Sequence, residues 1–566
     1  MHNPGSSNEP PRVNIADRLT EVARLHPRRR SIIFPHGRDA MGRVAYTHLT
    51  FQQLEELCNR YAHGLRDIGI GAGVRTLLMV RPSLDFAALA FALFKVGAVP
   101  VMIDPGMGPK EFVRCVGQVR PQAMLGIPAA HVLRAALRPW FRSIRIPVVL
   151  GRSRLFCRLS TNALLRRGRG RGRFSTAATQ ADDTAAILFT SGSTGPAKGV
   201  VYTHRIFDTQ VKILRDVYGI GSDDIDLPCF PLFSLFSTAL GATAVIPDMD
   251  PTKPATVNPE RIVEAIENHA ITCSFGSPTL WRTVTAHCIR HKIKFPTLKK
   301  VLMAGAPIPR YIHDRLLNHI LTDGGQTHTP YGATEALPVA DFTGHEVLAE
   351  TWEKTRRGAG VCVGHPIPGL QVNIIRTSDQ EIAAWDDSLL AKPGEIGEIT
   401  VKGSVVTPEY YQRPQPTKLA KIADPDGAVW HRMGDLGYLD QQGRLWVCGR
   451  KSHRVPTPNG DMQTLCCEAF FNEHPDVYRS ALVGLPEAGS QWRTPAVVIE
   501  PESGKFPGSA SARQKFQREL LELAAHSPLT KGIRIILFHR SFPVDVRHNA
   551  KIKREILADW AVKKQH

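Results

Sequence analysis

The stretch ILFTSGSTGPAKGVVYTH, at residues 187–204, joins an apolar run to a turn built from threonine, serine and glycine. Lys198 closes the turn, and a second apolar run follows it. Glycines allow a backbone to approach an anion, hydroxyl groups donate hydrogen bonds, and a lysine neutralises negative charge. This lysine is not followed by serine or threonine, so the turn is not a Walker A loop. The stretch predicts a strand that leads into a phosphate-binding loop.

Helix and strand patterns alternate on both sides of this loop. Before it, an amphipathic helical pattern at 49–69, with Thr50 as its expected N-cap, precedes a strand pattern at 74–80. After it, the same alternation returns between 242 and 303. Such alternation favours an α/β fold in which helices cover parallel sheets on both faces.

The C-terminal third of the chain has a different pattern. Glycine- and proline-marked turns within 390–450 predict β-hairpins. We place a domain boundary at the turn 449–453, between a large N-terminal domain at 1–448 and a small α+β domain at 454–566. Residues 1–12 are rich in proline, serine, asparagine and glycine, which predicts disorder.

Composition limits the class of protein. The net charge of +19 favours anionic partners such as phosphates or a membrane surface. The ten cysteines have no metal-binding spacing, as expected for reduced thiols in a cytoplasmic protein. No apolar signal segment opens the chain, and the apolar run at 86–94 is too short to span a bilayer. Contact with a membrane surface stays open.

A basic segment, RRGRGRGR at 166–173, contains five arginines and three glycines. It has little apolar surface to bury, which favours a mobile, solvated loop. The alternative is contact with an anionic surface or partner, as in Arg/Gly segments that bind single-stranded nucleic acid.

Five motifs in order carry a resemblance. The loop at 190–199 is followed by AGAP at 304–307, YGATE at 331–335, GDLG at 434–437 with GR at 449–450, and NAKIKR at 549–554. This order resembles the adenylate-forming superfamily, which includes acyl-CoA synthetases, adenylation domains and luciferases. The resemblance implies a large multi-layered domain of sheets and helices and a small C-terminal domain on a hinge at 449–453.

The resemblance also implies a nucleotide site for ATP. Its loop would hold the β- and γ-phosphates, two turns would enclose the adenine, and a carboxylate with an arginine would meet the ribose. The residues at these positions are Thr190, Ser191, Gly192, Ser193, Thr194, Gly195 and Lys198 for the phosphates; Gly305, Ala306, Pro307, Tyr331 and Gly332 for the adenine; and Asp435 and Arg450 for the ribose.

Three residues take catalytic roles by the same resemblance. Thr334 would contact the α-phosphate, and Glu335, with Thr190, would bind Mg²⁺, a hard cation that prefers oxygen ligands. Lys551 would bridge the carboxylate of the acid and the α-phosphate. A flexible cation suits that place, because negative charge develops there as the carboxylate attacks phosphorus.

The chain departs from CoA-forming relatives near its end. His548, Asn549 and Ala550 precede Lys551 where many such relatives have Ser/Thr-Gly, and the hinge position is Ser452. Two prolines stiffen the loop at 455–464, which those relatives usually build around glycines. These differences argue against CoA as a substrate.

The ending VDVRHNAKIKRE, at 544–555, resembles the β-lactone synthetases of bacterial olefin biosynthesis. That resemblance implies a long-chain 2-alkyl-3-hydroxy acid as substrate. The 3-hydroxyl of this acid attacks the activated carbonyl and expels AMP, and proximity favours such an internal nucleophile. Assembly with other enzymes of the hydrocarbon pathway is a further expectation.

The segment CFPLFSLFS, at 229–237, lies where relatives place the acyl pocket. Phe230, Phe233, Leu235 and Phe236 suit an alkyl chain, although an ordinary core segment has the same composition.

Two other functions remain open. One is a long-chain fatty acyl-CoA or acyl-AMP ligase. The other is a non-catalytic nucleotide-binding module whose basic loop contacts nucleic acid or a partner. The presence of Lys551, Glu335 and Asp435 together argues against the module, and nucleic acid is not favoured as a partner.

The role of Lys551 leads to a first prediction. Lys551→Ala should abolish adenylation and leave ATP binding largely intact, because a contact made in the transition state lowers turnover more than binding. Pyrophosphate release and nucleotide affinity, measured on the same preparation, test this. Unchanged pyrophosphate release in the variant would refute it.

Overall fold

The computed structural model of the chain describes residues 12–151, 157–190, 195–544 and 551–565. The chain forms two compact units. The first comprises Met1–Pro251, Glu260–Phe275 and Ser404–Thr417, and the second comprises Thr252–Pro259, Gly276–Gly403 and Lys418–His566.

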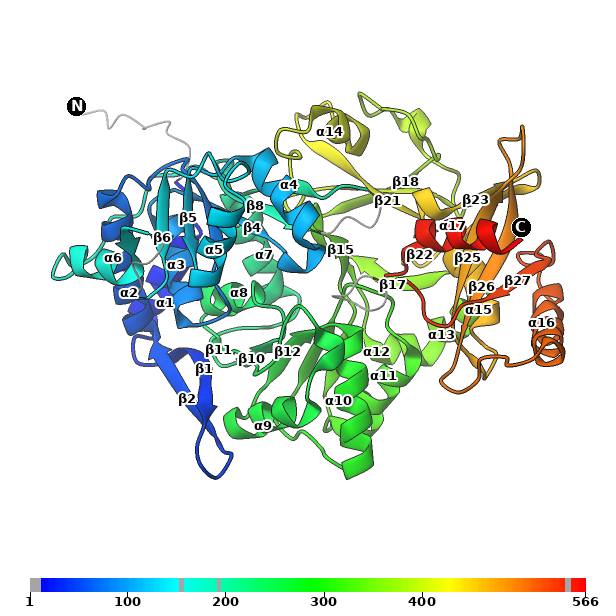
Figure 1. The fold of residues 1–566 in the computed structure, drawn as a ribbon, viewed down its shortest axis with the longest axis horizontal. Coiled ribbons are helices and arrows are strands. Elements are labelled where there is room, and N and C mark those ends of the chain that lie inside the picture. The colour runs from blue at the N-terminus through cyan, green and yellow to red at the C-terminus, as the bar shows by residue number, and fades with distance from the viewer. Residues whose placement is uncertain (1–11, 152–156, 191–194, 545–550, 566) are drawn as a thin grey trace, which may run out of the picture. The chain divides into compact units, whose positions relative to one another are not determined.

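A seven-stranded sheet in the first unit carries the stretch at 187–204 (Figure 1). β8 runs parallel to β4 and antiparallel to β9, so the strands before and after the predicted phosphate-binding residues are neighbours in the sheet. The strands, in spatial order, are β7 Leu159–Ser160, β6 Ile146–Val149, β5 Ala123–Gly126, β3 Arg75–Met79, β4 Val99–Ile103, β8 Thr184–Thr190 and β9 Lys198–Thr203.

The helices between these strands follow the sequence pattern closely. The Thr50 side chain accepts a hydrogen bond from the Gln53 backbone N–H, and the Gln53 side chain accepts one from the Thr50 N–H, which completes a capping box. The apolar run at 86–94 lies in a buried helix, as expected. The helices are α2 Phe51–Asp67, α3 Leu84–Lys95, α4 Pro109–Val119, α5 Pro128–Ala136 and α6 Thr161–Arg167, with the 3₁₀ turn η1 Pro105–Met107.

Lys95, at the end of the apolar run, is fully buried. Its Nζ lies 2.7 Å from Glu55 Oε1 and donates to Thr20 Oγ1 at 3.0 Å. A buried lysine requires such partners, because an unpaired charge in the core is costly.

The Arg/Gly segment at 166–173 packs on α2. A side chain at Gly168 would overlap the Arg60 carbonyl, and Arg171 pairs with Asp67 at 2.7 Å. Phe174 is buried against His63 of α2, with ring centroids 5.0 Å apart. Residues 168–173 therefore form a largely exposed turn and loop, as their composition predicts, and the contacts of Gly168 and Arg171 hold this loop against α2.

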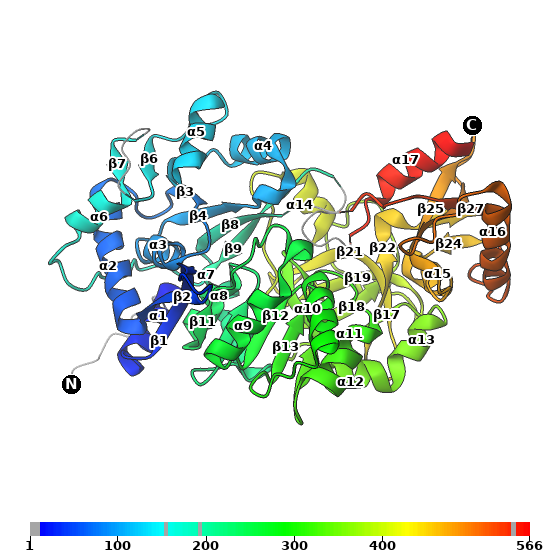
Figure 2. The ribbon, with the colours of Figure 1, turned by 60° about the horizontal axis from the view of Figure 1, so that its bottom comes forward.

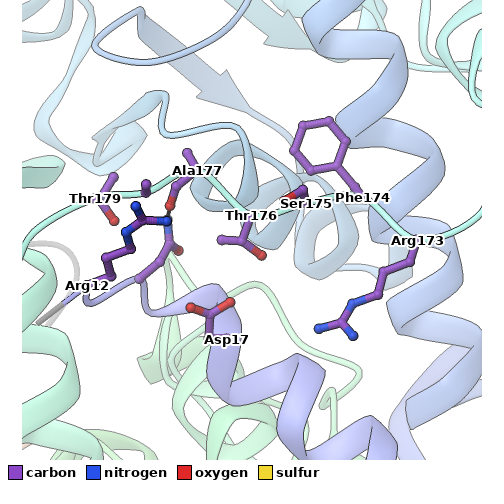
Figure 3. A pocket seen from close by; sticks show the side chains of 10 residues that line it. Arg12, Asp17, Arg173, Phe174, Ser175, Thr176, Ala177 and Thr179 are labelled. Atoms are coloured by element: carbon purple, nitrogen blue, oxygen red, sulfur yellow. Dashed lines mark hydrogen bonds between the residues drawn. The ribbon is translucent and has the colours of Figure 1, made fainter. Parts of the chain in front are cut away.

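Backbone pairing with the rest of the unit begins at Arg12, the last residue of the expected N-terminal tail. Arg12 forms an isolated antiparallel bridge with Gln180, and residues 1–11 lie outside the described residues. Figure 3 shows a small pocket at this place, with Asp17 of α1 between Arg12 and Arg173.

A second sheet in the first unit supports the expected acyl segment. β1 pairs in parallel with β11 and in antiparallel fashion with β2, and β10 lies in parallel between β11 and β12. Its strands and surrounding helices are β1 Arg30–Arg38, β2 Val44–Thr50, β10 Ile225–Pro228, β11 Thr243–Val245, β12 Cys273–Gly276, α1 Ala16–Leu25, α7 His204–Asp216, α8 Phe233–Leu240 and α9 Pro259–His269, with η2 Pro254–Thr256.

The second unit begins with parallel strands and continues as an antiparallel sheet (Figure 2). The predicted hairpins at 390–450 are strands of this sheet, whose order is β15-β16-β17-β22-β21-β19-β18 with β20 beside β21. The elements are α10 Pro278–His291, β13 Lys300–Met303, α11 Arg310–Arg315, β14 Gln326–His328, β15 Tyr331–Ala333, β16 Ala336–Asp341, α12 Gly344–Glu346, α13 Trp352–Arg356, β17 Val361–Pro366, β18 Gln371–Ile375, β19 Gly397–Lys402, α14 Pro414–Ala420, β20 Lys421–Ala423, β21 Val429–Leu439 and β22 Leu445–Arg450. Two π-helical segments, η3 Leu316–Ile320 and η4 Val347–Thr351, and the 3₁₀ turn η5 Asp387–Leu389 complete this part.

The C-terminal part of the second unit has its own core around a three-stranded sheet. The predicted hinge falls at a short 3₁₀ turn, and its role as a hinge stays a prediction. The elements are η6 Lys451–His453, β23 Val455–Thr457, β24 Gly460–Met462, α15 Thr464–Phe471, β25 Val477–Pro486, β26 Arg493–Pro501, α16 Ala510–Ala525, β27 Ile535–Phe538 and α17 Arg554–Gln565. In the described part of the chain, no helix is long and apolar enough to cross a membrane.

The capping box gives a prediction for α2. Thr50→Ala should destabilise the first turn of α2 by about 1 kcal/mol, because the Gln53 N–H loses its acceptor. Hydrogen–deuterium exchange of a peptide covering 51–54 should rise about fivefold. Thr50→Ser keeps the hydroxyl and is the matched control; equal exchange in the two variants would contradict the capping role.

Candidate active site

The described part of the phosphate loop has a backbone that requires glycine. Gly195 has φ +104°, a conformation that side chains rarely adopt. A Cβ at Gly199 would lie 2.7 Å from the Phe189 ring, so the returning strand also needs glycine. Ser191, Gly192, Ser193 and Thr194 lie outside the described residues, and Thr190 is described only as the last residue of β8.

Lys198 follows the loop at the start of β9. Its Nζ lies over the Tyr410 ring, 4.7 Å from the ring centre. The segment carrying Tyr410 runs beside β9, where the Tyr411 N–H donates to the Gly199 carbonyl at 2.8 Å. An aromatic face attracts a cation placed over it, so Tyr410 helps to position the Lys198 ammonium group.

Aromatic rings follow one another along the expected acyl segment. Phe233 stacks on Phe275 at 3.9 Å, and Phe230 and Phe236 lie 5.6 and 5.8 Å from Phe233. All three phenylalanines of this segment are only half-buried. Leu235 is half-buried as well, but it packs against a separate cluster that contains Ile32. The segment thus presents an apolar surface from Phe230, Phe233 and Phe236, while Leu235 faces the core.

A buried carboxyl group lies beneath this surface, and sequence patterns did not indicate it. Asp226 of β10 accepts a hydrogen bond from the Ser237 hydroxyl at 2.5 Å and one from the Cys273 thiol at 3.6 Å. Burial raises the pKa of Asp226 to about 7, although both hydrogen bonds lower it. The only sequence signal is an aspartate within an otherwise apolar strand.

The two turns predicted to bind adenine follow neighbouring parallel strands of the second unit. β13 and β14 run in parallel, with Leu302 opposite His328. The turn with Gly305, Ala306 and Pro307 follows β13, and Tyr331 and Gly332 follow β14. Carboxyl ends of neighbouring parallel strands meet at the same edge, which is where α/β folds bind ligands.

The residues predicted to meet adenine and ribose are joined directly. Tyr331 donates a hydrogen bond to Asp435 Oδ2 at 2.7 Å, and Arg450 Nε lies 3.2 Å from Asp435 Oδ1. Burial and the Asp435 carboxylate raise the pKa of Tyr331. Asp435 and Arg450 face each other on the antiparallel pair β21–β22. A carboxylate offers about four acceptor positions, so Asp435 can also accept from sugar hydroxyls.

Thr334 and Glu335 form the tight turn between β15 and β16 and are half-buried. A buried lysine, Lys421 of β20, is close enough to interact with Glu335. Burial lowers the pKa of Lys421 to about 7, although Glu335 raises it. No sequence pattern indicated Lys421.

The donor set near Glu335 fits Mg²⁺ that arrives with nucleotide. Among the described residues, no group of three or more histidine, cysteine or acidic side chains could hold a metal. Mg²⁺ needs only one or two carboxylates when phosphate oxygens supply the other ligands. Glu335 meets that requirement, and a site held by protein alone is not required.

Lys551 is half-buried and lies in a fixed segment. The Lys553 N–H donates to the Pro543 carbonyl at 2.8 Å, and Val544 and Ile552 form an antiparallel bridge. His548, Asn549 and Ala550 lie outside the described residues.

A buried ion pair holds the other side of this segment. Arg554 Nη2 lies 2.6 Å from both carboxylate oxygens of Glu468. Glu468 is buried and also accepts from the Leu482 N–H at 2.8 Å. Burial raises the pKa of Glu468, and Arg554 opposes that shift. Beside it, Glu555 meets His453 of η6 at 3.1 Å.

A family model described as AMP-binding enzyme matches residues 19–411. The chain belongs to the AMP-binding enzyme family. It is therefore an adenylate-forming ligase, and the expected superfamily is confirmed. Of the motifs quoted above, the first three lie within the matched residues.

Two relatives match almost the whole chain. An olefin beta-lactone synthetase of Stenotrophomonas maltophilia is 46% identical and covers 97% of this chain and 98% of its own length. One of Xanthomonas campestris is 43% identical, with 98% of both chains covered. The expected resemblance to β-lactone synthetases is confirmed.

The fold is also that of a solved adenylate-forming enzyme. The amide bond synthetase McbA of Marinactinospora thermotolerans superposes with a TM-score of 0.76 over 96% of this chain and 99% of its own, at 22% identity. The expected fold class is confirmed.

The ribose contact gives a testable prediction. Asp435→Ala should raise the KM for ATP in pyrophosphate exchange about tenfold or more, because hydrogen bonds to a carboxylate are among the stronger ones. Tyr331→Phe keeps the ring and the carboxylate and serves as the comparison, with a smaller increase expected. A KM in Asp435→Ala no higher than in Tyr331→Phe would exclude the ribose role.

Proposed function

We propose that this protein activates a long-chain 2-alkyl-3-hydroxy acid with ATP and closes it to a β-lactone. The near full-length identity of 46% and 43% to two olefin beta-lactone synthetases carries the proposal. Enzymes of this family use ATP together with Mg²⁺. The carboxylate of Glu335 can serve as a ligand of that Mg²⁺.

The first step joins the acid to the nucleotide. A carboxylate oxygen of the acid attacks the α-phosphorus, and the bond to pyrophosphate breaks. Thr334 and Lys551 stabilise the charge on the α-phosphate, while the loop before Lys198 holds the departing phosphates. Positioning and charge neutralisation supply most of the acceleration in such transfers.

The second step closes the ring. The 3-hydroxyl oxygen attacks the acyl carbonyl, the bond from that carbon to the AMP oxygen breaks, and the hydroxyl proton is released. No second substrate is consumed. Exclusion of water matters, because hydrolysis competes for the same acyl-AMP.

The half-buried rings of Phe230, Phe233 and Phe236 support an alkyl substrate. Burial of each methylene group contributes about 0.8 kcal/mol to the binding free energy. A surface made of three aromatic rings therefore favours a long alkyl chain. Leu235 is not part of this proposed surface, because it packs into the core.

The loop at 455–464 bears on the acyl acceptor. It forms the hairpin β23–β24, and Arg454 joins it through Asp461 at 2.9 Å. Pro456 and Pro458 leave this hairpin with fewer free backbone donors. We place the hinge at 449–453, before this hairpin, and we propose that CoA is not consumed.

A long-chain fatty acyl-CoA ligase is the second candidate. A Thermus thermophilus ligase of that name is 26% identical over 86% of both chains, well below the β-lactone synthetases.

Transfer of the insoluble substrate and product to neighbouring enzymes of the pathway is part of our proposal.

The acyl acceptor can be tested directly. With ATP and Mg²⁺, a 2-alkyl-3-hydroxy acid should give AMP, pyrophosphate and a product lighter than the acid by one water, at a rate indifferent to CoA. The unsubstituted fatty acid should stall as acyl-AMP or turn over slowly. Mass analysis identifies the products.

The two acids are run side by side, with and without CoA. If the unsubstituted acid and CoA give a thioester as fast as the hydroxy acid cyclises, the ligase function replaces the β-lactone function.

A further inference from the structure

Positive charge is concentrated in one part of the first unit. Residues 112–181 contain fourteen arginines, no lysine, and no aspartate or glutamate. The net charge of the whole chain is +19, so this segment of 70 residues carries most of it. Arginine binds phosphate through two parallel hydrogen bonds, which lysine cannot do.

One face of this segment is firmly attached to the unit. Leu133, Leu137 and Phe141 pack into the hydrophobic core beside β5 and β6. His131 of α5 is fully buried, and its Nε2 donates to the Val148 carbonyl at 3.0 Å. α5 and the turn after it are therefore a fixed surface, which Figure 2 shows on the outside of the first unit.

The opposite face combines apolar and basic side chains. Trp140 is 49% exposed and Val132 is 48% exposed. Arg138, Arg142 and Arg145, close to Trp140 in the sequence, are also exposed. Within the described residues, these three arginines form no ion pair with a carboxylate. We call this face the Trp140 surface; it comprises Val132, Arg138, Trp140, Arg142 and Arg145.

We propose that the Trp140 surface docks on an anionic phospholipid bilayer. Trp140 and Val132 enter the boundary between headgroups and acyl chains, and the arginines bind lipid phosphates. Tryptophan is favoured at this depth, because its ring is apolar and its N–H finds a polar partner. Arginine keeps its charge in the headgroup layer while its stem lies in the apolar layer.

A bilayer explains both halves of the surface. An acidic protein or a nucleic acid would use the arginines, but neither requires the exposed apolar side chains of Val132 and Trp140. A single weak anchor binds a membrane only marginally, and stable binding takes an apolar anchor together with basic charge. The proposed substrate and product are themselves lipids, so docking would place the enzyme where they partition.

Vesicle flotation of the full chain tests the proposal. We expect the protein to float with phosphatidylcholine vesicles that contain phosphatidylglycerol and to stay behind with phosphatidylcholine alone. High salt should release it, because salt screens exposed charges. No flotation with either vesicle overturns the proposal.

Matched variants locate the contact. R138E/R142E/R145E should lower the fraction bound by about tenfold or more, and W140S should lower it as well. R290E/R513E/R518E reverses three exposed arginines in the second unit and should bind like the unaltered protein. Pyrophosphate exchange should be unchanged in all three variants, which shows that they are folded.

Three results contradict the proposal. If the control R290E/R513E/R518E loses as much vesicle binding as R138E/R142E/R145E, the binding depends on net charge alone. If W140S binds vesicles as well as the unaltered protein, Trp140 does not insert into the bilayer. Displacement of the protein from vesicles by single-stranded RNA, together with RNA binding that depends on Arg138, Arg142 and Arg145, assigns the surface to nucleic acid. If the triple reversal fails to fold, R138Q/R142Q/R145Q takes its place.

Discussion

The buried ion pair between Glu468 and Arg554 holds the segment on which the proposed chemistry depends. Arg554 lies three residues after Lys551, and both of its contacts with Glu468 are 2.6 Å long. Loss of one partner from a buried pair costs about 3–5 kcal/mol, because the other charge stays unpaired. The proposed role of Lys551 is to bring its charge to the nucleotide, and the backbone that follows Lys551 is held by this pair and by the bridge at Ile552.

The same division of roles recurs around the nucleotide. Backbone requirements set the loop positions, as the positive φ of Gly195 and the close packing of Gly199 demonstrate. Side-chain pairs set the charged positions, as with Asp435 between Tyr331 and Arg450. A preorganised arrangement of this kind avoids reorganisation when charge develops in the transition state.

Burial and charge also explain why the basic composition does not disturb the fold. The turn after α5 places Phe141 in the core, while Arg138, Arg142 and Arg145 are exposed. Cations that leave the surface have a defined partner: the buried Lys95 meets Glu55, and the half-buried Arg554 meets Glu468. Positive charge therefore gathers on the surface, where it is available to anionic partners.

The sequence by itself determined the order of strand, glycine loop and helix, the cap at Thr50, and the motifs that define the family. These features depend on local backbone preferences, which neighbouring residues encode. Only the tertiary structure decided that Leu235 packs against the cluster of Ile32, that Lys421 approaches Glu335, and that Arg554 pairs with the buried Glu468. The physical reason is that the energy of a buried side chain depends on partners far along the chain. Glu468 precedes Arg554 by 86 residues, and no local pattern specifies which distant strands and helices become neighbours.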